Sequence, residues 1–160
     1  MFHRRILILA AAALALAGCA TSLTPVSVAD TIASKPQLST LNGLVTKAGL
    51  AEVLRTGGPF TVFAPTNEAF AKVPAKTMDD LAKDPAKLKA VLSYHVIPGK
   101  IMAADVKNGN SKTVNGANLA ISKAGDFVTV EDAMVQTADI SASNGVVHIV
   151  DSVLMPPASH

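Results

Sequence analysis

The chain has 160 residues, with 14 Lys and Arg, 12 Asp and Glu, and a single Cys. One Cys excludes an intramolecular disulfide, so the fold must depend on its hydrophobic core. Arg4 and Arg5 lie in a leader-like N-terminal segment. The other 12 basic residues are scattered and balance the 12 acidic ones, and this pattern argues against nucleic-acid binding.

Residues 1–18 have the pattern of an export signal. A basic start precedes the uncharged apolar run Ile6–Ala17, which suits a signal-peptide core and is too short to span a membrane. Leu16-Ala17-Gly18-Cys19 resembles the bacterial lipobox, whose Cys becomes an acylated N-terminus. We expect a lipoprotein signal peptide over 1–18, acylated Cys19 and a tether over 19–26, and an exported protein lipid-anchored in the cell envelope, on its periplasmic or surface face. The alternative is an ordinary cleavage site beside a chance Cys.

The segment before residue 58 has helical periodicity. Ser27 is expected to cap a helix that ends before Pro36. Leu41 and Val45 belong to the apolar stripe of a second helix, with Gly49 as its stop. Residues 50–54 make one further turn.

The next stretch predicts a buried strand that leads into a capped helix. Phe60–Ala64 is β-branched and aromatic, with apolar side chains on both faces, so we expect it to lie inside the domain. Pro65 ends the strand, and Thr66 supplies the cap of a helix that carries Phe70.

After Phe70 the chain is again helical. Thr77 opens a segment with capping-box spacing, and Asp84-Pro85 is a second helix start, a cap followed by proline at the first helical position. His95 continues the apolar stripe of the second helix, which we expect Pro98-Gly99 to break.

From Ser111 the apolar period changes from 3.6 to 2. Five strand-like runs, over 112–114, 119–122, 127–131, 134–137 and 146–154, are separated by turns that contain glycine. A helical first half and a hairpin-rich second half predict one α+β domain with mostly antiparallel strand pairing.

Three stretches together resemble the signatures of the fasciclin domain. They are Gly58–Phe70 (GPFTVFAPTNEAF), Tyr94–Gly99 (YHVIPG) and Asn144–Pro156 (NGVVHIVDSVLMP), in the family's order and spacing. We take 27–157 as the domain. The resemblance implies a wedge in which a mostly antiparallel β-sheet packs with several α-helices. It also implies roles in adhesion and extracellular binding rather than catalysis.

The same resemblance implies two candidate contact points for a partner. Tyr94-His95 is similar to a segment linked to integrin binding in animal matrix proteins, and Asp139-Ile140 is similar to an Asp-Ile dipeptide linked to the same activity. The residues themselves also allow structural roles at two of these positions, since His95 faces inward on its helix stripe and Asp139 is placed to brace the loop to Asn144. Tyr94 is placed to expose its ring edge, which would allow a contact.

The sequence predicts no catalytic, metal or cofactor site. His148 alternates with Val146 and Val150 on one strand face, as a structural histidine does. Asp151 points to the opposite face of that strand, which argues against a metal site shared with His148. No nucleophile elbow or phosphate-binding loop is present, so we expect a protein that is not an enzyme.

The leading hypothesis is a non-catalytic binding or adhesion module, displayed in the cell envelope or at the surface. It would recognise a protein or glycan partner, including a second copy of itself in a homophilic contact. The alternative hypothesis is a periplasmic small-ligand carrier or stress-protective protein with the same fold. A carrier needs an apolar cavity.

Overall fold

The helices begin where the sequence places capping side chains. In the computed structural model, which describes residues 26–156, the side chains of Ser27, Thr66 and Asp84 each accept hydrogen bonds from backbone N–H groups of the following helix. These three predicted helix starts are confirmed. The helices are α1 (Val28–Ala33), α2 (Ser39–Lys47), α3 (Ala51–Thr56), α4 (Asn67–Ala71), α5 (Ala75–Lys83) and α6 (Pro85–Tyr94), with the 3₁₀ turns η1 (Pro36–Leu38) and η2 (Ala103–Asp105).

Two helix boundaries differ from the prediction. Helix α5 begins directly after Pro74, so Thr77 lies inside the helix and does not cap it. Proline has a fixed φ and no N–H, which suits it to the position just before a helix. Helix α6 ends at Tyr94, and the next residues form strand β2 (Val96–Pro98) rather than a last helical turn. This segment is β-branched and ends in proline, and both features disfavour a helix.

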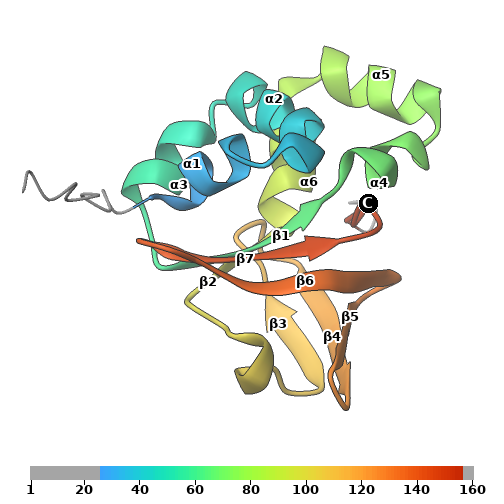
Figure 1. The fold of residues 1–160 in the computed structure, drawn as a ribbon. Helices are drawn as coiled ribbons and strands as arrows, with labels where there is room; N and C mark the ends of the chain where they lie inside the picture. Colours follow the sequence, from blue (N-terminus) through green and yellow to red (C-terminus); the bar gives the residue numbers. More distant parts are fainter. Residues whose placement is uncertain (1–25, 157–160) are drawn as a thin grey trace, which may run out of the picture.

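The strands form one seven-stranded sheet, which lies below the helices in Figure 1. The strands in sequence order are β1 (Phe60–Pro65), β2 (Val96–Pro98), β3 (Gly109–Lys112), β4 (Asn118–Ala124), β5 (Phe127–Val130), β6 (Ala133–Ala142) and β7 (Gly145–Val150). Their order across the sheet is β2-β1-β7-β6-β5-β4-β3. Every neighbouring pair is antiparallel except β1 and β7. The predicted α+β class with mostly antiparallel pairing is therefore confirmed.

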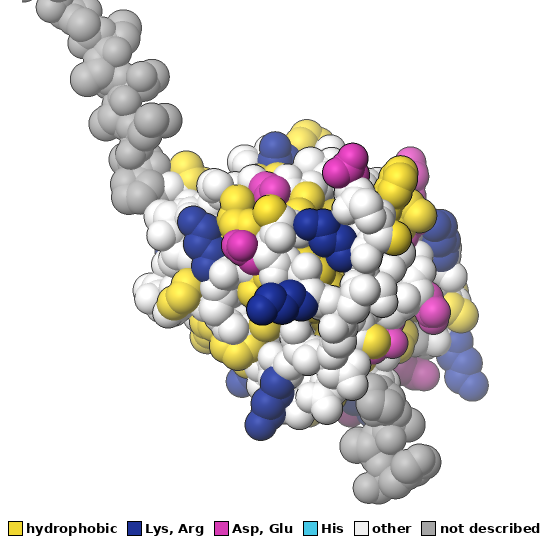
Figure 2. All heavy atoms as spheres, turned by 90° about the horizontal axis from the view of Figure 1, so that it is seen from below, with side chains coloured by type: hydrophobic (Ala, Val, Ile, Leu, Met, Phe, Trp, Pro, Cys, Tyr) yellow, Lys and Arg dark blue, Asp and Glu magenta, His cyan; other side chains and the backbone are white. Residues whose placement is uncertain are grey.

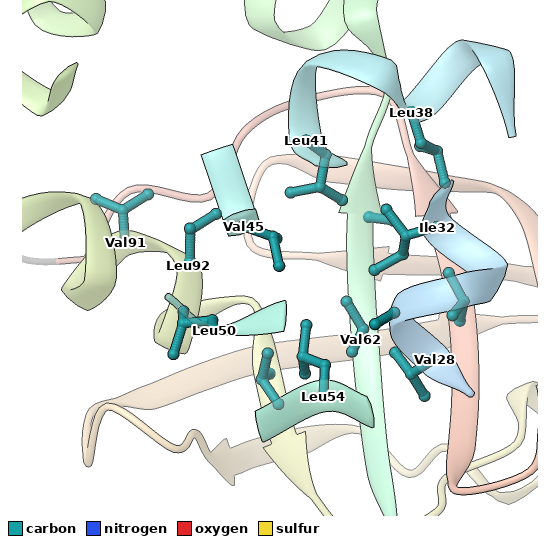
Figure 3. Close-up of a cluster of buried hydrophobic side chains, with 14 of the residues drawn as sticks. Val28, Ile32, Leu38, Leu41, Val45, Leu50, Leu54, Val62, Val91 and Leu92 are labelled. Carbon is teal, nitrogen blue, oxygen red and sulfur yellow. The ribbon is translucent and has the colours of Figure 1, made fainter. Parts of the chain in front are cut away.

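Strand β1 is internal and apolar on both faces, as predicted. Val62 and Ala64 join a core between the sheet and the helices, to which α1, α2, α3 and α6 contribute most of the side chains labelled in Figure 3. Phe63 is 1% exposed and joins a second core, built largely from β4 and β5. Strand β1 thus separates two cores. Burying one such large apolar side chain stabilises the fold by about 1.5–3 kcal/mol.

The second half forms the predicted hairpins with shifted boundaries. Strand β3 lies earlier than predicted, because Thr113 closes a turn onto Ala117. Strand β6 has ten residues, whereas the alternation predicted only residues 134–137. Two register shifts against β7 interrupt its period of two, so the pattern conceals its second half. Strand β7 ends at Val150, before the predicted end at 154.

Asn144 joins the helical half to the sheet. Its side-chain Oδ1 accepts a hydrogen bond from the backbone N–H of Val28 at 2.8 Å, and its Nδ2 donates to the carbonyls of Leu54 at 2.7 Å and Gly57 at 2.6 Å. Its own carbonyl accepts from the N–H of Phe60 at 2.9 Å. One residue in the β6–β7 turn therefore fixes the start of α1 and the end of α3 through its side chain, and the start of β1 through its backbone carbonyl.

Gly145, the next residue, allows β1 and β7 to approach each other. A Cβ atom built at this position would overlap the carbonyl oxygen of Phe60, the residue it faces in the parallel pair. The hairpin turn predicted at Asn144-Gly145 lies one residue earlier, over Ser143 and Asn144, and Gly145 already pairs with Ala142 as the first residue of β7. Asn144 and Gly145 thus each act at the start of the parallel pair as well as at this hairpin.

The predicted signal peptide, Cys19 and nearly all of the tether lie outside the described residues. Among residues 26–156, no helix is long and apolar enough to cross a membrane. The lipid anchor therefore stays a prediction from the sequence.

Candidate functional site

The segment that joins β2 to β3, residues 99–108, lies against the sheet and is called the crossover segment below. The hydroxyl of Thr61 donates to the carbonyl of Gly99 at 2.7 Å and accepts from the N–H of Ile101 at 2.8 Å. Thr61 is a small polar residue on the otherwise apolar strand β1, and it is buried. A side chain of the central strand thus fixes the beginning of the crossover segment.

His148 on β7 is the second residue that holds the crossover segment. Its Nδ1 accepts a hydrogen bond from the backbone N–H of Asp139 at 3.2 Å, so the ring proton is on Nε2, which donates to the carbonyl of Ile101 at 2.8 Å. The ring also stacks on Phe63, with 5.6 Å between the centroids. Burial lowers the pKa of His148, opposed by the Ile101 carbonyl and the Asp139 carboxylate. The predicted structural role of His148 is confirmed.

Asp139 lies on β6 at the surface and also contacts the crossover segment. Its backbone is left-handed, with a φ of 58°, and its Oδ1 accepts a hydrogen bond from the N–H of Ala103 at 2.7 Å. This contact differs from the predicted one, since Asp139 braces η2 rather than the loop to Asn144. Ile140 is half-buried and packs against the helix-side core.

His95 lies at the C-terminal end of α6 and is buried, as its place on the helix stripe predicts. Its Nδ1 donates to the carbonyl of Val91 at 2.7 Å, and its Nε2 accepts from the N–H of Leu154 at 2.9 Å. Burial lowers the pKa of His95 from 6.5 to about 4, although the hydrogen bond to Val91 opposes this shift. His95 therefore connects α6 to the segment after β7 in its neutral form.

Tyr94 is buried as well, so the expectation that it exposes its ring edge is wrong. The side chain is 2% exposed, because the strands of the second half cover it. Its hydroxyl lies 3.3 Å from the carbonyl oxygen of Asn118 and 3.2 Å from Oε1 of Glu131. Burial, followed by the Glu131 charge, raises the pKa of Tyr94 to about 12. Of the four residues marked by the resemblance, Tyr94 and His95 lie inside, Ile140 is half-buried, and Asp139 is exposed.

A hollow of about 290 Å³ lies beside the crossover segment and is called the basic hollow below. It is lined by Lys100, Ile101, residues 105–111 and Ile121. Figure 2 views the molecule from this end, where several Lys and Arg side chains lie on the surface with Asp and Glu side chains among them. Sequence reasoning missed this hollow because its lysines are scattered along the chain, and only the crossover brings them together.

The described residues offer no group of three His, Cys, Asp or Glu side chains suited to hold a metal ion. Asp151 accepts a hydrogen bond through Oδ1 from the N–H of Met134, on the side of β7 away from His148. Asn144, His148 and Asp151 of the stretch Asn144–Pro156 thus each have a structural partner.

Comparisons with known proteins identify the family. A family model described as Fasciclin domain matches residues 36–156. The chain belongs to the fasciclin domain family. This membership confirms the resemblance found in the three sequence stretches.

Several relatives and a solved structure are similar to this fasciclin-domain chain. Protein sll1483 of Synechocystis is 44% identical over 133 residues, covering 82% of this chain and 74% of the relative. The cell surface glycolipoprotein MPB83 of Mycobacterium bovis is 38% identical over 136 residues, covering 82% of this chain and 61% of the relative. A FAS1 domain pair from the insect cell adhesion molecule Fasciclin I matches with a TM-score of 0.67 and 16% identity, over 81% of this chain and 51% of that chain, which shows the shared fold.

Lowering the pH from 7 to 4 should destabilise the protein. Both buried histidines have lowered pKa values and stay neutral when folded, whereas the unfolded chain takes up protons near pH 6.5. Their contribution to stability is complete above pH 6.5 and is lost as the pH falls toward the folded pKa. For His95 alone the loss by pH 4 is about 3 kcal/mol. Urea unfolding at a series of pH values measures it.

His95→Gln separates this effect from the titration of carboxylates. Its amide supplies one donor and one acceptor but does not titrate. The unfolding free energy of this variant should therefore change less between pH 4 and 6.5 than that of the wild type. Identical pH profiles for the two proteins would contradict the neutral, buried state of His95.

Proposed function

We propose that this fasciclin-domain protein is a non-catalytic binding module, displayed in the cell envelope or at the cell surface, where it recognises a protein or glycan partner. Membership of the family supports the proposal. So does its similarity to a mycobacterial protein named as a cell surface glycolipoprotein and to domains of an insect cell adhesion molecule.

The hydrogen bonds of the two buried histidines are the observation that supports a non-catalytic function. Both ring nitrogens of His95 and of His148 are hydrogen-bonded to backbone groups. A general base must have a nitrogen free to reach the proton that it removes. Both histidines therefore act as structural cross-links between segments.

Asp139 is the residue we propose as the first contact for a partner. Its side chain is exposed, and one carboxylate oxygen accepts the single bond from Ala103. A carboxylate has about four acceptor positions, so further capacity remains for donors of a partner. Ile140, the next residue, is half-buried against the helix-side core and would anchor this part of β6 beneath the contact. Tyr94 and His95 would support this contact indirectly, by fixing the strands behind it.

The size of the apolar hollow argues for a surface contact over a small-ligand carrier. This hollow lies between α3, β1 and β2 and is lined by Leu50, Val53, Leu54, Phe60, Ser93, Val96 and Val114. Its volume is about 20 Å³. Ligand pockets usually have about 300–1,000 Å³, so this hollow holds about one water molecule and has no room for an apolar ligand.

We place the module at a membrane through acylated Cys19. Two acyl chains would make the attachment durable, whereas one chain binds only marginally. Cys19→Ser should move the protein from the detergent-extracted envelope fraction to a soluble or unprocessed form. An unchanged distribution between fractions would disprove the anchor.

Adhesion of beads that carry the purified protein tests the binding function. Wild-type beads should attach saturably to cells of the same species or to host surfaces. Asp139→Asn keeps an acceptor for Ala103 and removes the charge, so attachment should weaken by about tenfold, as expected for one charge-assisted contact. Bead counts under flow provide the readout, and circular dichroism verifies that the variant is folded.

Asp79→Asn is the matched control, because Asp79 is an exposed carboxylate on α5, on the helix side of the sheet in Figure 1. It should leave attachment unchanged. An equal loss in both variants would contradict a contact at Asp139. Folded wild-type protein that attaches to no surface would contradict the binding module itself.

A further inference from the structure

Three lysines surround the basic hollow at the end of the sheet away from the helices (Figure 1). Lys100 and Lys107 line it. Lys123 borders it on β4, where its backbone N–H donates to Oδ1 of Asn108 at 2.6 Å and its Nζ lies 3.4 Å from the carbonyl of Ala104. Lys123 is half-buried, so the crossover segment partly fixes this ammonium group in place.

The positive charge of the hollow is not neutralised by neighbouring carboxylates. Both ion pairs in the described part of the chain use Arg55, so these three lysines have no carboxylate within 4.0 Å. Asp105 is the only acidic residue in the lining. The lining alone has an excess of one positive charge, and bordering Lys123 raises it to two, in contrast with the balance of charges along the chain after the leader. A concave site with one sign of charge raises the local concentration of counter-ions.

The rest of the lining is suited to a sugar ring. Asn108, Asn110 and Ser111 supply neutral donors and acceptors of the kind that sugar hydroxyls need. Ile101, which is half-buried, supplies apolar surface for the carbon face of a ring, and buried Ile121 forms the floor of the hollow. The volume of about 290 Å³ is close to the lower end of small-molecule sites, which suits one sugar unit.

We propose that the basic hollow binds an anionic sugar unit of an acidic glycan. The ammonium groups would pair with its carboxylate, sulfate or phosphate, and the amides and the hydroxyl would bond its ring hydroxyls. Lysine is a point charge without a fixed fork geometry, so the three kinds of anion are accepted alike. The lining contains no aromatic ring, and single-stranded nucleic acids require stacking platforms. This inference rests on the proposed binding function and adds the charge of the partner and the place where it binds.

Calorimetric titration of the purified protein with defined oligosaccharides tests the site. Oligogalacturonate supplies carboxylates, sulfated dextran supplies sulfates, and unmodified dextran is the neutral control. The protein should bind both charged oligosaccharides and not the neutral one, and added salt should weaken the binding because it screens the lysines. The triple variant Lys100→Gln, Lys107→Gln, Lys123→Gln should bind about tenfold more weakly or worse, because it loses three charge contacts.

The matched control changes the same number of charges elsewhere. Lys76→Gln, Lys83→Gln, Lys87→Gln alters exposed lysines on α5 and α6 and should leave the affinity unchanged. The double variant Lys100→Gln, Lys107→Gln omits the half-buried lysine, so it keeps the test valid if the triple variant does not fold. It should also bind more weakly.

Three outcomes would overturn the site. They are no binding of either charged oligosaccharide, an equal loss in the two triple variants, and binding of poly-glutamate as tight as that of oligogalacturonate, which would indicate an acidic polypeptide instead. The bead assay distinguishes a failure of this inference from a failure of the proposed binding function. If the Lys100, Lys107, Lys123 variant still adheres, the protein is a binding module but the basic hollow does not bind an anionic glycan during adhesion.

Discussion

The fold depends on the parallel pairing of β1 with β7, which Asn144 makes possible. A parallel neighbour in an otherwise antiparallel sheet must arrive from a distant part of the chain, here from the middle of the helical half. Asn144 offers one acceptor and two donors to three backbone groups of that half. Each of those groups would otherwise be an unpaired polar atom near the core. The turn before β7 therefore fixes where β1 begins.

Once β1 is in place, its two faces organise the rest of the molecule. Val62 faces the helix-side core and Phe63 faces the strand-side core, so neither half of the chain can bury its apolar surface without this strand. The polar side chains of strands β1 and β7 have a different role. Thr61 on β1 and His148 on β7 hold the crossover segment through Ile101. The internal pair of strands thus positions the loop beside which both proposed contact surfaces lie.

The parts of the fold that could be predicted are those determined by local patterns. The caps at Ser27, Thr66 and Asp84 and the two-faced strand β1 depend on neighbouring residues alone. Strand β6 was only partly predicted, because its register shifts follow from its pairing with β7 and break the period that a sequence shows. The prediction extends helix α6 beyond its observed end at Tyr94 for a similar reason. Residues 96–98 are β-branched and end in proline, which disfavours a helix, and their pairing with β1 makes them a strand.

The candidate site was harder to predict, because burial and proximity both depend on tertiary structure. Helical periodicity places His95 inside and Tyr94 at the edge, yet the second half folds over that edge and buries Tyr94. The basic hollow has no sequence signature at all. Lys100, Lys107 and Lys123 come together only because the crossover segment folds back beside β4.

The unfolding free energy of Asn144 variants tests this account most directly. Asn144→Ala removes three hydrogen bonds and should cost about 3 kcal/mol, and Asn144→Asp should cost at least about 2 kcal/mol because its carboxylate faces two carbonyls. Ser143→Ala, a change at the exposed neighbour, should stay within about 0.5 kcal/mol of the wild type. Losses below about 1 kcal/mol for both Asn144 variants would show that the parallel pair forms without this side chain.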